Sequence, residues 1–379
     1  MKRKIFFLFF IFEFLALAVF AQPYSTASPI QSKQADSLLL LLKKDKSDTG
    51  KVIHLNKLSR EYINIGAYDR ALYYAGEALQ LGKNLKFKKE IAAAYTNLGR
   101  IHSNKGDHSK SLENYSTALK IRKEIDDKKG IAESYNNFGN TYDILGNYER
   151  ALEYHLLSFK LKEAINDNKG IADSYNNIGN IYFRQGNYEQ ALENHFSSFK
   201  IRKKLSDQKG MADSYNNIGS IYQTLGKKEK AMENYLASLK IEEELGNKSG
   251  IADSYNNIGE VYRNQNNYEK ALENYQLGLK IYTAMGEKRG LAISSLNIGI
   301  TLITKSNYKE AETYLLNSLK NFKESGARHG MIELYQKLSE VSAKLNNYKS
   351  AHAYHQLYSQ LKDSLYNKAV SYTHLTLPT

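Results

Sequence analysis

Asparagine supplies the most regular polar pattern of this 379-residue sequence. The string SYNNIG starts at Ser174, Ser214 and Ser254, and SYNNFG starts at Ser134. The second asparagine recurs every 40 residues, and we call this series the asparagine ladder: Asn97, Asn137, Asn177, Asn217, Asn257 and Asn297. Because an asparagine amide both donates and accepts hydrogen bonds, the ladder can bind a peptide backbone of any sequence. The alternative is a set of hydrogen bonds between adjacent repeats, since helices do not otherwise favour asparagine.

Charged and polar residues extend this pattern along one predicted helix. Spacings of four, three and four residues separate Asp173, the ladder asparagine, Asn180 and Arg184, which places them on one stripe. Asp213 and Asp253 repeat Asp173 in the following copies. An acidic edge would favour a basic or N-terminal group on a ligand. Acidic residues in a first helical turn also complement the helix dipole, and both interpretations stay open.

The copy over residues 291–330 replaces this polar stripe with apolar side chains. Its equivalent positions hold Ile293, Leu296 and Ile300, followed by Ile303. An exposed apolar patch marks a contact surface. The patch is therefore either a pocket for a hydrophobic anchor of a ligand, or a packing surface for a C-terminal segment or a second chain.

Residues for catalysis or metal binding do not form a recognisable pattern. The chain has no cysteine, which excludes disulfides and thiol chemistry. His352 and His355 are three residues apart, but no third ligand accompanies them. No phosphate-binding loop, zinc-protease motif or nucleophile-elbow motif occurs. We therefore expect no catalytic residue, no metal, no cofactor and no enzyme activity.

The elements that position the stripe follow from the period of 40. An array over residues 51–368 contains about eight repeats, and the six over residues 91–330 are clear. Residues 22–50 form a linker and a capping helix. In 171–210 a first helical face comprises Ala172, Tyr175, Ile178, Gly179 and Tyr182. Gly186 breaks this helix, Asn187 is positioned to cap the next, and the second face runs from Tyr188 through His195 to Ile201. Asp207 is the predicted cap of the following helix, with Asp127, Asp167 and Asn247 at its position. Each repeat is therefore a predicted helical hairpin.

This pattern of aromatic, aliphatic-glycine and tyrosine positions, followed by alanine and small residues, resembles the tetratricopeptide repeat. The 40-residue length resembles the repeats of kinesin light chain and of bacterial peptide-sensing regulators. The resemblance implies an all-α fold, a right-handed α-solenoid of stacked helical hairpins with a concave groove lined by first helices. It also implies that the ladder asparagines hold the main chain of an extended peptide or protein. Histidine replaces the second-helix aromatic at His155, His195 and His355.

The N-terminus predicts export. Lys2-Arg3-Lys4 precedes an apolar run to Phe20, which reads as a signal peptide over 1–21. We expect a periplasmic chain, or one held at the membrane facing the periplasm. The net charge of +13 does not indicate nucleic-acid binding, because lysines such as Lys160 and Lys200 repeat on the second helix without a groove of stacking aromatics.

The C-terminus departs from the repeat. Residues 369–379 resemble the translation of a sequencing adapter. We expect residues 371–379 not to continue the helix, and the natural chain to extend beyond residue 368. Residues 358–368, YSQLKDSLYNK, and the signal peptide resemble the sensor region of Bacteroidetes-type membrane histidine kinases. That resemblance implies the input module of a signalling protein, with membrane contact only through the signal segment or a following helix. The alternative is a stand-alone periplasmic assembly or secretion scaffold.

Overall fold

The computed structural model describes residues 33–327 and 330–373. These residues form seventeen α-helices and no strand, which confirms the all-α prediction. They divide into two compact units, Met1–Gly106 (unit 1) and Asp107–Thr379 (unit 2). No helix in the described ranges is long and apolar enough to cross a membrane. The predicted signal peptide, 1–21, and the last residues of the tail lie outside the described residues.

Unit 1 contains a short helix followed by three long ones. The helices are α2 (Lys33–Leu42), α3 (Thr49–Asn64), α4 (Tyr68–Asn84) and α5 (Lys88–Asn104). Helix α2 falls within the stretch 22–50 and packs against α3. The core joins Ala35 of α2 to Leu58 and Tyr62 of α3, Ala71 of α4 and Ile101 of α5.

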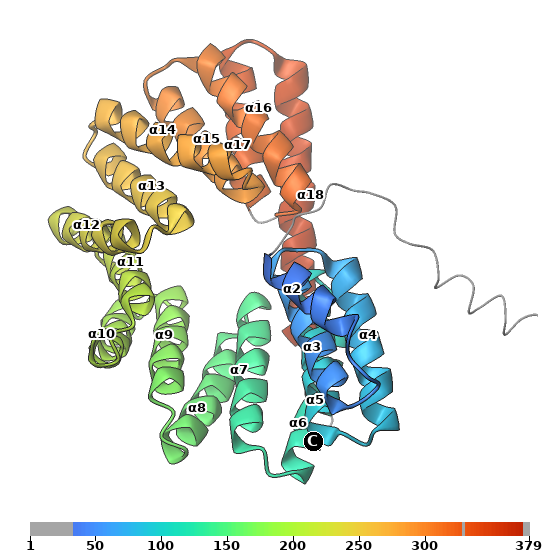
Figure 1. Cartoon of the computed structure of the whole chain (residues 1–379). Helices are drawn as coiled ribbons and strands as arrows, with labels where there is room; N and C mark the ends of the chain where they lie inside the picture. Colours follow the sequence, from blue (N-terminus) through green and yellow to red (C-terminus); the bar gives the residue numbers. More distant parts are fainter. Residues whose placement is uncertain (1–32, 328–329, 374–379) are drawn as a thin grey trace, which may run out of the picture. The chain divides into compact units, whose positions relative to one another are not determined.

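Unit 2 is a series of helical hairpins that follow one another from α7–α8 to α17–α18 (Figure 1). Its helices are α6 (His108–Glu124), α7 (Lys128–Ile144), α8 (Tyr148–Ala164), α9 (Asn168–Arg184), α10 (Tyr188–Lys204), α11 (Gln208–Thr224), α12 (Lys228–Leu245), α13 (Lys248–Asn264), α14 (Tyr268–Met285), α15 (Lys288–Thr304), α16 (Tyr308–Ser325), α17 (Gly330–Lys344) and α18 (Tyr348–Thr373). Each odd-numbered helix packs chiefly on the next helix in the chain, as the predicted hairpins require.

First helices line the inner side of the stack within unit 2. Helix α9 contacts α11, α13 contacts α15, and α15 contacts α17. In the described part of the unit, no second helix makes a comparable contact with another second helix. The first helices are therefore closer together, and the surface that carries the asparagine ladder is the concave one.

Turns and caps explain the sharp hairpin boundaries. Gly186 adopts φ +78°, the left-handed conformation that glycine enters without steric cost, and ends α9 as predicted. The carboxylate of Asp207 accepts a hydrogen bond from the backbone N–H of Gly210 (3.1 Å), and Asp127 and Asp167 make the same cap. Two predicted caps are wrong. Asn187 makes no side-chain cap bond, and Asn247 donates instead to Glu242 Oε2 (2.7 Å).

Glycine inside the helices permits close packing within each hairpin. A Cβ placed on Gly179 would lie 2.9 Å from the imidazole Nε2 of His195, which is itself 1% exposed. His195 therefore fills the predicted aromatic core position. His355 does not, because it is exposed on α18. Ser174, the first residue of SYNNIG, is fully buried as well.

The C-terminal helix is longer than predicted. Helix α18 runs to Thr373, so the expectation that residues 371–379 do not continue the helix is wrong for the first three of them. Residues 369–373 contain neither proline nor glycine, and the first helix-breaking residue of the tail is Pro378.

Candidate functional site

The two adjacent asparagines of SYNNIG have different roles in the structure. The Nδ2 of Asn177 donates to Oδ1 of Asn136 in the preceding repeat (2.8 Å), and Asn217 donates to Asn176 in the same way (2.8 Å). Asn257 donates to Asn216 with a longer distance of 3.4 Å. The ladder asparagine is the donor and the first asparagine of the previous pair is the acceptor. These bonds join neighbouring first helices, which is the inter-repeat role that the sequence left open.

The outer members of the ladder are held differently. Asn97 in unit 1 donates to the backbone oxygen of Asn56 (3.0 Å). In the three bonds above, the acceptor lies 41 residues before the donor. For Asn137 that position holds a threonine, and the buried Nδ2 of Asn137 has no partner among the described residues. The acceptor expected for Asn297 is Asn256, which instead exchanges hydrogen bonds with Ser294 (3.0 and 3.1 Å). The interlocked ladder therefore comprises the three bonds from Asn177 to Asn257.

The inter-repeat bonds do not use the whole amide. Asn177, Asn217 and Asn257 are half-buried, and their side-chain oxygens accept no hydrogen bond from the described residues. Each amide therefore keeps an acceptor for a backbone N–H of a ligand. The ladder can join repeats and bind a peptide with the same side chains.

A hollow of about 370 Å³ lies on this surface between α9 and α11. Three residues of the predicted stripe line it: Asn180 and Arg184 from α9, and Asn217 from α11. The sequence did not identify its remaining lining residues, which are Phe183, His195, Ser220 and Ile221. His195 was assigned to the packing face of the second helix, and no sequence signal marked Phe183, Ser220 or Ile221. The hollow combines amide groups, a guanidinium and apolar walls, the usual composition of a small binding site.

The polar groups of this hollow have defined charges. The side chain of Arg184 is 53% exposed, and its Nε lies 3.2 Å from Oδ1 of Asp143 on α7. Burial raises the pKa of Asp143, whereas the positive charge of Arg184 lowers it. Burial, together with the nearby charge of Arg202, lowers the pKa of His195 from 6.5 to about 4. His195 is therefore neutral at neutral pH, and Arg184 supplies the positive charge of the hollow.

The predicted acidic edge contacts buried side chains of the second helices. Arg202 of α10 is 5% exposed; its Nη2 donates to Asp173 (3.1 Å), and its Nη1 lies 3.7 Å from Asp213. Arg202 thus links the acidic residue of its own hairpin to that of the next. Asp253 accepts a hydrogen bond from the hydroxyl of Tyr282. A basic group of a ligand would have to compete with these partners for the three carboxylates.

Glu242 occupies the position of Arg202 in the next hairpin and is 2% exposed. Its carboxylate accepts a hydrogen bond from Asn247 (2.7 Å). Burial raises the pKa of Glu242, and the negative charges of Asp213 and Asp253 raise it further. This hairpin junction therefore has a carboxylate where the preceding one has a guanidinium.

The apolar end of the stripe belongs to the core of the last hairpins. Leu296 is 5% exposed and packs in one cluster with Leu334 and Leu338 of α17, so its assignment to an open pocket is wrong. Ile293 and Ile300 are half-buried against the same cluster. The physical reason is that α17 covers this end, which corresponds to the alternative of packing against a C-terminal segment.

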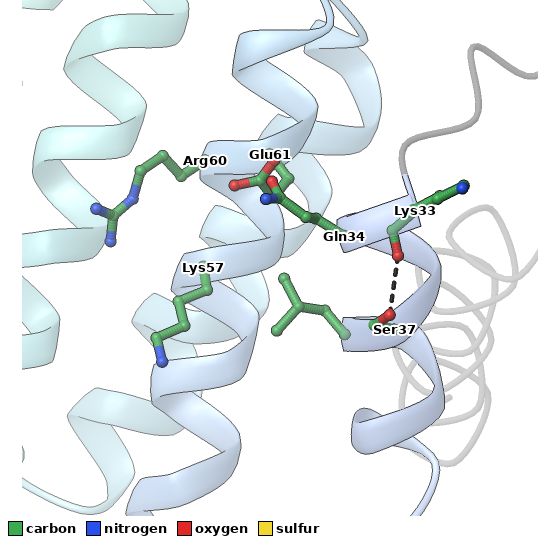
Figure 2. Close-up of a pocket in the computed structure, with 7 residues that line it drawn as sticks. Lys33, Gln34, Ser37, Lys57, Arg60 and Glu61 are labelled. Carbon is green, nitrogen blue, oxygen red and sulfur yellow. Dashed lines mark hydrogen bonds between the residues drawn. The ribbon is translucent and has the colours of Figure 1, made fainter. Parts of the chain in front are cut away.

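Unit 1 has a separate hollow of about 480 Å³ between α2 and α3 (Figure 2). Lys57, which holds the ladder position in the weak repeat 51–90, lines it with Arg60, Glu61 and Lys33. Figure 2 shows Lys57 and Arg60 extending from the same side of α3. The hollow is basic and shallow, and it contains no ladder asparagine.

Family comparisons agree with this geometry. Residues 90–164 and 170–244 match the model of the tetratricopeptide repeat, and residues 209–374 match that of the soluble NSF attachment protein, SNAP. The chain therefore carries tetratricopeptide repeats. No curated protein matches its sequence significantly.

Solved structures with the same fold include a conjugation gene regulator, a quorum sensor and the protein BtubC. The Rap conjugation gene regulator of plasmid pLS20, in complex with the Phr* peptide, is 12% identical with a TM-score of 0.62, covering 91% of this chain and 98% of its own. The apo quorum sensor NprR from B. thuringiensis is 18% identical with a TM-score of 0.57, covering 87% and 97%. BtubC (BKLC) from P. vanneervenii is 20% identical with a TM-score of 0.52, covering 58% and 92%. At these identities the likeness establishes the fold alone.

Proposed function

We propose that the chain is a non-enzymatic scaffold that binds an extended peptide or protein segment along the concave face of unit 2. One observation carries this proposal: the hollow between α9 and α11 brings Asn180, Arg184 and Asn217 together, next to ladder amides whose oxygens have no partner among the described residues. Amides at regular intervals match the repeating N–H and C=O groups of an extended main chain. Arg184 would bind a carboxylate of the ligand. A structural relative solved with a bound peptide supports this class of ligand.

The binding test uses a phage-displayed library of random linear peptides, selected on the purified chain. We expect Asn180→Ala and Arg184→Ala to weaken a selected peptide by about tenfold or more, because each variant removes a side chain that lines the hollow. The thermal stability of Asn180→Ala should change little, since Asn180 makes no hydrogen bond with the described residues. Arg184→Ala also leaves Asp143 without its ion pair, so circular dichroism must show that this variant is folded.

A matched control is Asn194→Ala. Asn194 lies on the second helix α10 and donates only to the backbone oxygen of Gln190 in its own helix (2.7 Å). Peptide affinity should be unchanged in this variant. The proposal fails when no peptide is enriched, or when Asn180→Ala and Asn194→Ala bind the selected peptide with equal affinity.

We further propose that the chain is the extracytoplasmic input module of a signalling protein, exported by its N-terminal segment. The basic residues and apolar run before Gln22 support export. Mass spectrometry of the chain expressed in a Gram-negative host should find Gln22 as the first residue, in the periplasmic fraction. The coding sequence after residue 368 separates the two functional classes. A spanning helix with a kinase domain supports sensing, whereas an early stop codon favours the stand-alone scaffold.

A further inference from the structure

The second helices of unit 2 expose a row of large apolar side chains. Leu156 on α8 is 40% exposed, Phe196 on α10 is 45% exposed, and Leu236 on α12 is 49% exposed. They are spaced by 40 residues and so occupy one position of three consecutive repeats. This face lies opposite the ladder, because the first helices form the inner side of the stack. The peptide site therefore leaves the apolar row uncovered.

Charges of opposite sign border the row on its two sides. Each apolar residue follows a glutamate by three positions and precedes a lysine by four: Glu153, Glu193 and Glu233 on one side, Lys160, Lys200 and Lys240 on the other. These spacings place all three residue types on one stripe of each helix, with the acid and the lysine about 10 Å apart along the axis. All six charged residues are exposed, and none forms an ion pair within the described part of the chain.

The three repeats thus carry an acidic band, an apolar band and a basic band in parallel across α8, α10 and α12. A rotation of 180° about an axis that lies in the interface and follows the apolar band through Phe196 reverses the order of the bands. It places the acidic band of one copy over the basic band of another, with the apolar bands in contact. We propose that two copies of this chain associate through this face, with Glu153 opposite Lys160 of the second copy and Glu193 opposite its Lys200.

A second copy fits this surface better than another class of partner. A nucleic acid or an anionic membrane would be bound by a surface of one sign, and the acidic band would repel it. An isologous interface requires a patch that is complementary to itself after a two-fold rotation. The equal numbers of glutamates and lysines on either side of the apolar band meet this requirement. Burying the three apolar side chains contributes affinity, and the charged bands set the orientation.

The test reverses each band separately and measures mass by sedimentation velocity. The variant E153K/E193K/E233K and the variant K160E/K200E/K240E should each be monomeric, because each carries two bands of like charge. An equimolar mixture of the two variants should form a heterodimer, since bands of opposite sign then face each other on both sides. The wild-type chain should dimerise, more weakly at high salt.

A matched control is K129E/K169E/K209E, which changes the net charge by the same amount at exposed positions in the first turns of α7, α9 and α11. It should remain dimeric. Circular dichroism checks that every variant is folded. The proposal is overturned when the wild-type chain is monomeric at all concentrations, when the control also dissociates, or when the mixed variants stay separate.

Discussion

The inter-repeat hydrogen bond between Asn217 and Asn176 makes a prediction that a double-mutant cycle can test. The perturbation is Asn217→Ala, Asn176→Ala and their combination. Each single change removes the 2.8 Å bond, and the combined change removes nothing further from it. The coupling free energy of the cycle therefore measures the bond itself.

The expected coupling is about 0.5–1.5 kcal/mol, the net value of a neutral hydrogen bond in a protein. The stability of a single variant would not reveal it. Alanine is favoured over asparagine in a helix by up to about 0.7 kcal/mol, which offsets much of the loss. Because this propensity difference is present in both the single and the double variants, it cancels in the cycle.

The assay is equilibrium urea unfolding followed by circular dichroism. Repeat arrays unfold in parts, so the curves should be fitted with a nearest-neighbour model in which the α9–α11 junction has its own free energy. The coupling should appear in that junction term. Native-state hydrogen exchange of α9 and α11 provides an independent measurement.

A control cycle pairs Asn176→Ala with Asn257→Ala. Asn257 donates to Asn216 rather than to Asn176, so these two changes should be additive within about 0.3–0.5 kcal/mol. A coupling for Asn176 and Asn217 no larger than this control would refute the assignment of the ladder as an inter-repeat link.

Three further changes test the packing of the hairpins. Glu242→Gln should raise the free energy of unfolding at neutral pH, because burial and two neighbouring aspartates raise the pKa of Glu242 above its usual 4.5. The charged carboxylate therefore destabilises the folded state at neutral pH, and glutamine removes that charge. The gain in stability should vanish as the pH falls through the raised pKa, because Glu242 is then protonated in the folded wild-type chain. A gain that persists at acidic pH would contradict this explanation. Asp207→Ala should cost about 1 kcal/mol by loss of the cap on Gly210, whereas Asn187→Ala, which removes no cap bond, should cost much less in the same urea titration. Gly179→Ala should cost about 1–3 kcal/mol in thermal unfolding, because its Cβ would lie 2.9 Å from the buried ring of His195; a neutral effect would show that the ring can move aside.

The sequence predicted the hairpins because their signals are local. Gly186 marks the end of α9, and Asp207 caps α11 within three residues of itself. The apolar spacing of Ala172 and Ile178 reports which face is buried, and both are buried. Such signals need no knowledge of the neighbouring repeat, so a period of 40 was sufficient.

The contacts between repeats were predicted less well. Which partner receives the amide of Asn177 depends on how the neighbouring first helices stack. The sequence favoured a ligand as the partner and left a neighbouring repeat as the alternative. Leu296 was misplaced because its burial comes from α17, which begins more than 30 residues later. The ion pairs of Arg202 were missed because a basic residue near the end of a second helix usually faces solvent.

The 41-residue step of the asparagine bonds has an evolutionary consequence. Deletion of residues 171–210 would place Asn217 41 residues after Asn136, in the position that Asn177 now holds. Asn217 could then donate to Asn136, the present acceptor of Asn177. Asp213 would then face Lys162, the cation that occupies the position of Arg202 one repeat earlier. A duplication of the same 40 residues would recreate every donor, acceptor and charge pair in the added copy. Unequal recombination among the repeats of the interlocked ladder can thus lengthen or shorten the array by whole repeats while the asparagine bonds of these junctions are kept, so its span can adapt to ligands of different length.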